Sequence, residues 1–212
     1  MRKVIASTKI LTFFTITTLL FTFTACSSQN TTHQMYIQKA KLTKEEQSLI
    51  ELIGVESIPY ILDFSVDDTI QSLQINTYEL VNNKWNLLSG GAQQLNKTTG
   101  RIAFTFENVG LGLKLAIEND GFNSYETKAD FNFKGLSTAN SYLINRKTIK
   151  YDQEIPLVIQ VHTSQNGVSC LLPEYGFYQP QLYKDLGYEK IYAITCLFSQ
   201  KTVNELSSSL DT

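Results

Sequence analysis

Hydrophobic and polar residues alternate along most of the chain after residue 58. In the run from Arg101 to Phe106, for example, Ile102 and Phe104 would face one side of an extended chain and Ala103 the other. A period of two residues indicates a half-buried β-strand. We therefore predict about nine short strands, over residues 58–66, 69–81, 84–89, 101–106, 111–117, 122–129, 130–133, 155–163 and 191–199.

Turn signals separate these runs. Asn82-Asn83 is expected to turn the chain inside a hairpin that Gly90-Gly91 ends, and Asp120-Gly121 is a second hairpin signal. Such short connections favour strands that pair in antiparallel fashion with their neighbours in sequence.

The strand at 155–163 carries a histidine. Leu157, Ile159 and Val161 are expected to share its apolar face. His162 would then lie on the opposite face, where it is directed to solvent or to an interface.

One helix is indicated before the first predicted strand. Thr43 and Glu46 have the spacing of a capping box, in which each side chain bonds the backbone N–H of the other residue. Leu49, Leu52 and Ile53 continue as an apolar stripe. We predict a helix over residues 43–53 that packs on a sheet through this stripe.

These elements predict a mainly β fold with one short N-terminal helix. The expected architecture is an antiparallel β-sandwich, with an immunoglobulin-like arrangement as one option and a β-barrel as the alternative. We assign residues 36–203 to a single β domain, and we expect the polar tail at 204–212 to be frayed.

Residues 1–25 differ from the rest of the chain. Arg2 and Lys3 are followed by a run, interrupted by Lys9, that contains only apolar residues and threonine from Ile10 to Ala25. A short basic start before an apolar region is typical of a secretory signal peptide. The run has 16 residues, fewer than the roughly 20 that a membrane-spanning helix needs.

The end of this segment, Thr24-Ala25-Cys26, resembles the lipobox of bacterial lipoproteins, although Phe23 stands where an aliphatic residue is usual. The resemblance implies that Cys26 receives a diacylglycerol and that the bond before it is cut. Two acyl chains hold a protein stably on a membrane, whereas one does so marginally. The expected location is the extracytoplasmic face of the bacterial cell membrane, with residues 26–35 as a flexible tether.

Charge and motifs exclude several functions. The predicted mature chain has 15 basic and 20 acidic residues, so it lacks the basic surface that nucleic acids require. The two histidines are His33, in the tether, and His162, and we find no motif of a nucleophilic hydrolase, zinc protease or nucleotide-binding enzyme. No catalytic residue, metal site or cofactor is therefore predicted. A hydrolase that uses paired carboxylates remains the alternative, because such pairs leave no local signature.

Two cysteines remain besides Cys26. Cys170 and Cys196 could form a disulfide outside the cytoplasm, or both could be buried free thiols. Cys196 is in phase with Ile194 and Phe198 in the strand at 191–199, which predicts that it points into the core.

The most suggestive segment for binding is 173–188, which contains a predicted helix at 180–186. Its rings suit stacking on a sugar or peptide, but they could equally pack the loop onto the sheet. The five aromatic residues are Tyr175, Phe177, Tyr178, Tyr183 and Tyr188.

The chain is similar in layout to small extracytoplasmic lipoproteins that carry one β domain and have no assigned activity. We therefore expect a non-catalytic binding or interaction domain at the cell envelope. Envelope glycans, peptides or a neighbouring membrane protein are its candidate partners, in addition to the membrane that holds its lipid anchor.

Overall fold

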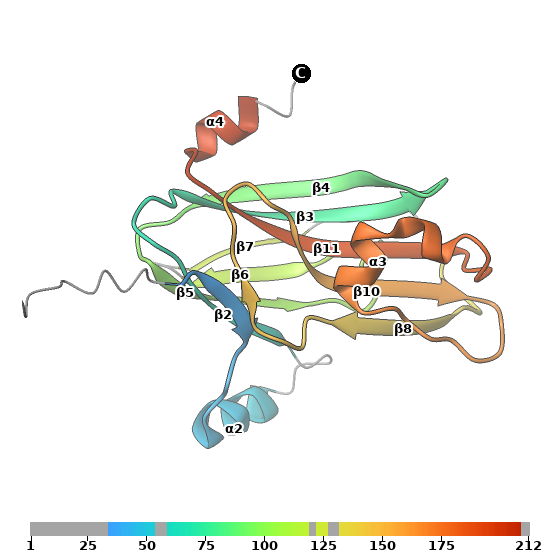
Figure 1. Cartoon of the computed structure of the whole chain (residues 1–212). Helices are drawn as coiled ribbons and strands as arrows, with labels where there is room; N and C mark the ends of the chain where they lie inside the picture. Colours follow the sequence, from blue (N-terminus) through green and yellow to red (C-terminus); the bar gives the residue numbers. More distant parts are fainter. Residues whose placement is uncertain (1–33, 54–58, 119–121, 127–131, 209–212) are drawn as a thin grey trace, which may run out of the picture. The chain divides into compact units, whose positions relative to one another are not determined.

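The computed structural model describes residues 34–53, 59–118, 122–126 and 132–208, which form two antiparallel sheets (Figure 1). The six-stranded sheet has the order β7 (Phe122–Glu126), β6 (Lys114–Glu118), β5 (Thr99–Thr105), β2 (Tyr60–Ser65), β1 (Tyr36–Lys39) and β9 (Lys147–Thr148). The five-stranded sheet has the order β4 (Lys84–Gln94), β3 (Ser72–Val81), β11 (Lys190–Ser199), β10 (Ile155–Thr163) and β8 (Ser137–Tyr142). The helical elements are α2 (Lys44–Ile53), α3 (Pro173–Tyr178), η1 (Pro180–Tyr183) and α4 (Val203–Ser208).

The main hydrophobic core lies between the two sheets. Leu62 and Phe104 come from the six-stranded sheet and Leu73 and Ile194 from the five-stranded one, and all four are buried. Each sheet keeps two edge strands, so neither closes into a barrel. The predicted antiparallel β-sandwich is therefore confirmed.

The strand order differs from that of an immunoglobulin domain. In both arrangements the third strand pairs with a late strand of the chain. In immunoglobulin domains the strand beyond that partner follows it in sequence. Here β11 pairs with β3, and the strand beyond it is β10, which precedes it. The strands of this sandwich are therefore connected in a different order from those of an immunoglobulin domain.

Eight of the predicted strands overlap observed ones, but β1, β8 and β9 were missed. β1 and β9 contain four and two residues, too few to show a period, and β8 has the largely polar sequence STANSY. The strand predicted at 130–133 falls partly outside the described residues, and Asn132 and Phe133 are not in a strand. The predicted hairpin turn at Asp120-Gly121 also lies outside the described residues.

The β3–β4 hairpin confirms the turn at Asn82 and Asn83, which have φ angles of 52° and 62°. Positive φ at both central residues is the geometry of a type I′ turn. The predicted end at Gly90-Gly91 is wrong, because β4 continues to Gln94. Gly90 lies inside the strand, and its lack of a side chain makes room for Asn76, because a Cβ atom at Gly90 would lie 2.5 Å from Oδ1 of Asn76.

The predicted face of β10 is wrong because the strand contains a β-bulge between Pro156 and Val158. A bulge adds one residue and reverses the alternation beyond it. Leu157 therefore points into the main core, whereas Ile159 and Val161 belong to a second hydrophobic cluster on the other face. His162 is fully buried and does not face solvent.

α2 forms as predicted but does not pack as predicted. The amide of Glu46 donates to Oγ1 of Thr43 over 3.2 Å, and the amide of Thr43 donates to Oε2 of Glu46 over 2.7 Å, which confirms the capping box. Leu49 and Leu52 nevertheless remain 57% and 82% exposed. The helix is attached instead through the Glu46 carboxylate, which accepts a hydrogen bond from the Arg101 guanidinium.

Both ends of the described domain contact the rest of the fold. The side-chain amide of Gln34 donates to Oγ1 of Thr148 over 3.3 Å. At the other end, the tail predicted to be frayed forms α4, and its Leu206 is buried. Residues 209–212 lie outside the described residues.

Candidate binding surfaces

The segment 172–186, which we call the cap, lies on the outer face of the five-stranded sheet, over β10 and β11. It contains α3 and η1, of which η1 occupies part of the helix predicted at 180–186, and α3 was not predicted. Beneath it lies the second hydrophobic cluster, built on Ile159, Val161, Tyr183, Ile191 and Ala193. Both faces of β10 are therefore covered, which explains why every residue of this strand is buried.

Phe177 is the main aromatic contact between the cap and the sheet. Its ring stacks on Trp85 of β4 with centroids 5.3 Å apart, and it meets Tyr78 of β3 at 5.6 Å. The indole N–H of Trp85 donates to the backbone carbonyl of Phe177 over 2.8 Å. Trp85 therefore contacts Phe177 through both its ring and its N–H group, and these two contacts fix the position of α3 on the sheet.

Tyr183 and Tyr188 also serve packing. Tyr183 is buried, and its ring lies 6.2 Å from that of Tyr188, whose hydroxyl donates to the carbonyl of Ser169 over 2.6 Å. Gly176 permits the close approach of Tyr183, because a Cβ atom at Gly176 would lie 2.1 Å from the tyrosine hydroxyl. Burial raises the pKa of Tyr183.

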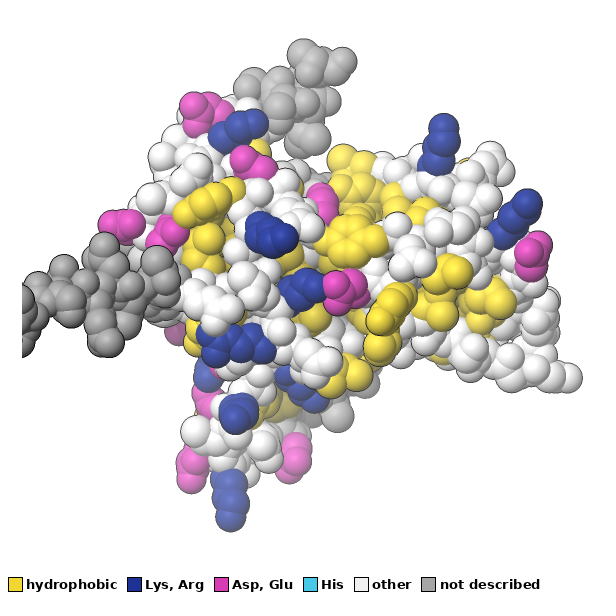
Figure 2. Space-filling view, viewed as in Figure 1, with side chains coloured by type: hydrophobic (Ala, Val, Ile, Leu, Met, Phe, Trp, Pro, Cys, Tyr) yellow, Lys and Arg dark blue, Asp and Glu magenta, His cyan; other side chains and the backbone are white. Residues whose placement is uncertain are grey.

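The other two predicted rings are exposed. Tyr175 and Tyr178 are 57% and 43% exposed, whereas Phe177, Tyr183 and Tyr188 belong to the second hydrophobic cluster or pack against it. Three exposed leucines of the cap, which sequence analysis did not identify, add to the apolar surface that Tyr175 and Tyr178 form. Figure 2 shows hydrophobic side chains over and around α3, and the exposed set in the cap is Leu172, Tyr175, Tyr178, Leu182 and Leu186.

A polar network connects the cap to the sheet. The carboxylate of Glu154 accepts hydrogen bonds from Asn76 over 2.7 Å and Tyr78 over 2.8 Å, and a further one from Thr195. The hydroxyl of Tyr178 donates to the backbone carbonyl of Glu154. Sequence reasoning missed this network, because its members come from β3, β11, α3 and the turn before β10.

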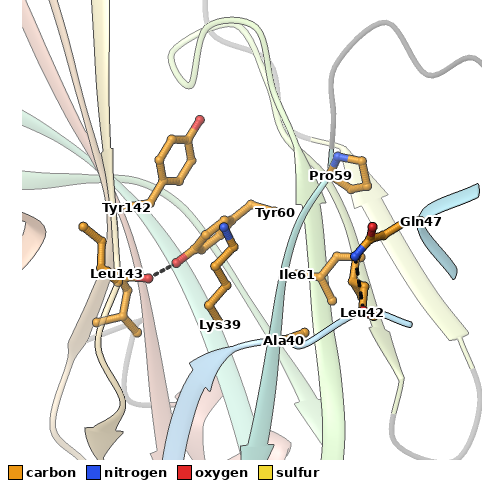
Figure 3. Close-up of a pocket in the computed structure, with 10 residues that line it drawn as sticks. Lys39, Ala40, Leu42, Gln47, Pro59, Tyr60, Ile61, Tyr142 and Leu143 are labelled. Atoms are coloured by element: carbon orange, nitrogen blue, oxygen red, sulfur yellow. Dashed lines mark hydrogen bonds between the residues drawn. The ribbon is translucent and has the colours of Figure 1, made fainter. Parts of the chain in front are cut away.

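A groove of about 580 Å³ opens between the segments that follow β1, begin β2 and follow β8 (Figure 3). The hydroxyl of Tyr60 donates to the carbonyl of Leu143 across it, and its ring lies 4.8 Å from that of Tyr142. Burial raises the pKa of Tyr60. Apolar side chains dominate the lining, which consists of Lys39, Ala40, Leu42, Gln47, Pro59, Tyr60, Ile61, Tyr142, Leu143 and Ile144.

His162 lies inside the sandwich and not in an open site. Its ring nitrogens lie 3.0 Å from Oγ1 of Thr138 and 2.9 Å from Oε1 of Gln160, and its ring lies 4.5 Å from that of Phe133. Burial lowers the pKa of His162 to about 4. His162 is therefore a neutral core residue at neutral pH. His33 lies outside the described residues.

The two cysteines are free thiols on opposite faces of the five-stranded sheet. Cys196 is fully buried in the main core, as predicted, and Cys170 packs against the second cluster. The structure places them in different hydrophobic clusters and leaves both as free thiols. Burial raises the pKa of Cys170 to about 12 and raises that of Cys196, so neither is a reactive thiolate at neutral pH.

Acidic residues meet on the outer face of the six-stranded sheet around Arg101. Asp63 and Glu118 occupy positions on either side of Arg101 in the paired strands β2 and β6, and all three line one shallow depression. The guanidinium donates to Asp63 over 2.8 Å and to Glu46, whose pKa is lowered mainly by this hydrogen bond. A general acid in a carboxylate-pair hydrolase needs a raised pKa, so the lowered pKa of Glu46 does not suit this residue to that role.

The described residues contain no group of three or more His, Cys, Asp or Glu side chains arranged to hold a metal ion. Among the described helices, none has the length and apolar character needed to cross a bilayer. Cys26, the predicted lipidation site, lies outside the described residues. No protein-family model, curated protein or solved structure matches this chain.

Proposed function

We propose that this chain is a membrane-tethered extracytoplasmic lipoprotein whose β domain binds a protein or peptide at the cell envelope and does not catalyse a reaction. The tether is supported by residues 1–28, with their basic start, apolar run and Ala25-Cys26 junction. The observation that carries the binding role is the exposed apolar surface of the cap.

The cap has the composition of a protein-binding surface. Three of its five exposed hydrophobic residues are leucines, which lack the flat ring that stacks on a sugar, so the surface favours a peptide over a glycan. Aromatic residues are enriched where proteins meet, and a rigid support reduces the entropy cost of binding. The contact of Phe177 with Trp85 supplies that support.

The anchor is tested by growing cells that express the full chain with labelled palmitate. Label should appear in the wild-type protein and disappear in the Cys26→Ser variant, which should also leave the membrane fraction. A labelled Cys26→Ser protein would contradict the assignment of the anchor.

The binding role is tested by screening the unlipidated mature chain against a peptide display library and a saccharide array. Peptides selected by the wild type should bind at least tenfold more weakly to Tyr175→Asp and Leu182→Asp variants, because a charge at the centre of an apolar interface is costly. Leu52→Asp, at a residue of α2 that is 82% exposed, is the matched control and should bind like the wild type. Selection of saccharides alone, or equal losses in all three variants, would contradict the proposed surface.

A further inference from the structure

The basic residues of the domain are not spread evenly. The segments 34–44 and 137–151 contain no Asp or Glu, whereas the mature chain as a whole has 20 acidic and 15 basic residues. Six of the basic residues lie in these two segments, which leaves nine for the rest of the mature chain against all 20 acidic ones. These six are Lys39, Lys41, Lys44, Arg146, Lys147 and Lys150.

The fold brings the two segments together. β1 pairs with β9, with Tyr36 opposite Thr148 and Ile37 opposite Lys147, at the edge of the six-stranded sheet. Arg146 lies over the ring of Tyr36, 3.6 Å from its centroid. We call the six basic residues on these segments the basic edge. Figure 2 shows several Lys and Arg side chains on the part of the viewed face that lies between α3 and α2.

The basic edge also carries apolar surface. Ile144 is 68% exposed, and it lines the groove together with Lys39. Cationic side chains beside exposed apolar ones match the interface of an anionic bilayer, where phosphate groups lie next to acyl chains. Lys147 is paired with Glu174, so the other basic residues contribute more of the attraction.

The predicted tether enters the domain at this edge. Gln34 is the first described residue, and its side-chain amide donates to Oγ1 of Thr148 in β9. Eight peptide units separate Gln34 from Cys26, and these span at most about 28 Å. A lipid on Cys26 would therefore allow the basic edge to approach the membrane surface. Salt screens the attraction between charges that are more than about 10 Å apart, so the basic edge must come within that distance of the lipid phosphates.

We propose that the basic edge docks on the surface of a bilayer rich in anionic phospholipid and so orients the domain on the membrane. The proposal rests on the proposed function in one respect, since the anchor at Cys26 is what brings the domain near the membrane. The affinity of the basic edge for anionic lipid does not depend on that anchor. Both hydrophobic clusters consist of residues within 35–198, so we expect the mature chain to fold without the lipid.

The test measures binding of the unlipidated mature chain to vesicles by sedimentation at low ionic strength. The wild type should bind vesicles containing phosphatidylglycerol and release them in salt, and it should bind phosphatidylcholine vesicles much more weakly. The variant Lys39→Gln/Arg146→Gln/Lys150→Gln should bind on the order of 100-fold more weakly, the factor for about 1 kcal/mol lost per basic residue near an anionic surface.

The matched control is Lys84→Gln/Lys114→Gln/Lys184→Gln, which removes the same charge from exposed residues outside the basic edge. It should bind within about threefold of the wild type. Equal losses in the two variants, or equal binding to both kinds of vesicle, would overturn the proposal. The palmitate experiment tests only the anchor, and the vesicle experiment uses a chain without lipid. Failure of the proposed anchor and failure of the proposed docking surface are therefore distinguishable.

Discussion

Two helical segments lie on this sandwich and are attached to it in different ways. α2 begins with a complete capping box and is linked to the sheet by the ion pair between Glu46 and Arg101, while Leu49 and Leu52 stay in solvent. The cap has no side-chain hydrogen bond at the start of α3, yet it places Phe177 and Tyr183 against the second hydrophobic cluster.

The difference shows that forming a helix and docking it depend on separate interactions. A capping box satisfies backbone groups at a helix end and adds about 1 kcal/mol, but it does not select a neighbour. Docking requires apolar area removed from water, at about 25 cal/mol per Å². The cap has that area in its rings, and Gly176 lets Tyr183 approach closely, whereas Leu49 and Leu52 of α2 remain exposed to solvent.

The largest expected effect comes from removing the ring that anchors the cap. Phe177→Ala should lower the free energy of unfolding by about 3 kcal/mol, because it removes a half-buried ring that contacts Trp85 and Tyr78. Urea denaturation followed by circular dichroism measures this loss. The matched change in α2, Leu52→Ala, should alter stability by less than about 0.5 kcal/mol, since the side chain is already in solvent. Equal losses would remove the distinction between the two segments.

A second effect concerns the contact of Gly176 with Tyr183. Gly176→Ala should destabilise the domain by about 2 kcal/mol, because the new methyl group would overlap the tyrosine hydroxyl. Tyr183→Phe should be neutral or slightly stabilising, since that hydroxyl is buried with no hydrogen-bond partner among the described residues. In the double variant, loss of the hydroxyl should restore part of the stability, and strictly additive free energies would contradict the proposed overlap.

The architecture was largely predictable, because it depends on signals that are local in the sequence. Alternation located most of the strands, and Asn82-Asn83 turned the hairpin as its residue types require. The bulge in β10 was not predictable from the period of its apolar residues. Ile155 to Ile159 is a continuously apolar run with both faces buried, so it does not reveal where the alternation reverses.

The surfaces were less predictable than the fold, because each joins segments that are distant in sequence. The acid-free segments 34–44 and 137–151 are visible in the sequence, but the pairing of β1 with β9 is what makes them one basic edge. In the same way, the aromatic residues of the cap were visible, but the division between exposed Tyr175 and buried Tyr183 depends on how α3 meets the sheet.

A third, smaller effect isolates the polar part of the attachment of the cap. Trp85→Phe retains most of the aromatic contact with Phe177 but removes the N–H that donates to its carbonyl. Stability should fall by about 1 kcal/mol, the usual net contribution of one hydrogen bond. Amide hydrogen exchange should show faster exchange in α3 than in the wild type. A loss as large as that of Phe177→Ala would show that the indole, and not the phenylalanine ring, dominates the contact.

The smallest effect is a dependence of α2 on pH. The Arg101 guanidinium lowers the pKa of Glu46 from its usual value of 4.5, so the folded state favours the ionised carboxylate. This contribution is therefore present above about pH 4.5 and is lost as pH falls through the lowered pKa of the folded state. Hydrogen exchange in α2 should accelerate over that acidic range.

Glu46→Gln is the matched variant for this titration, because it keeps a hydrogen-bonding side chain and removes the charge. Its α2 should exchange faster than the wild type at pH 6 and should lose the part of the pH dependence that comes from Glu46. The same change should leave exchange in α3 unaltered, since the contact of Phe177 with Trp85 contains no ionisable group. If Glu46→Gln released the cap together with α2, the two segments would form one cooperative unit, and the separation between forming and docking a helix would not hold for this domain.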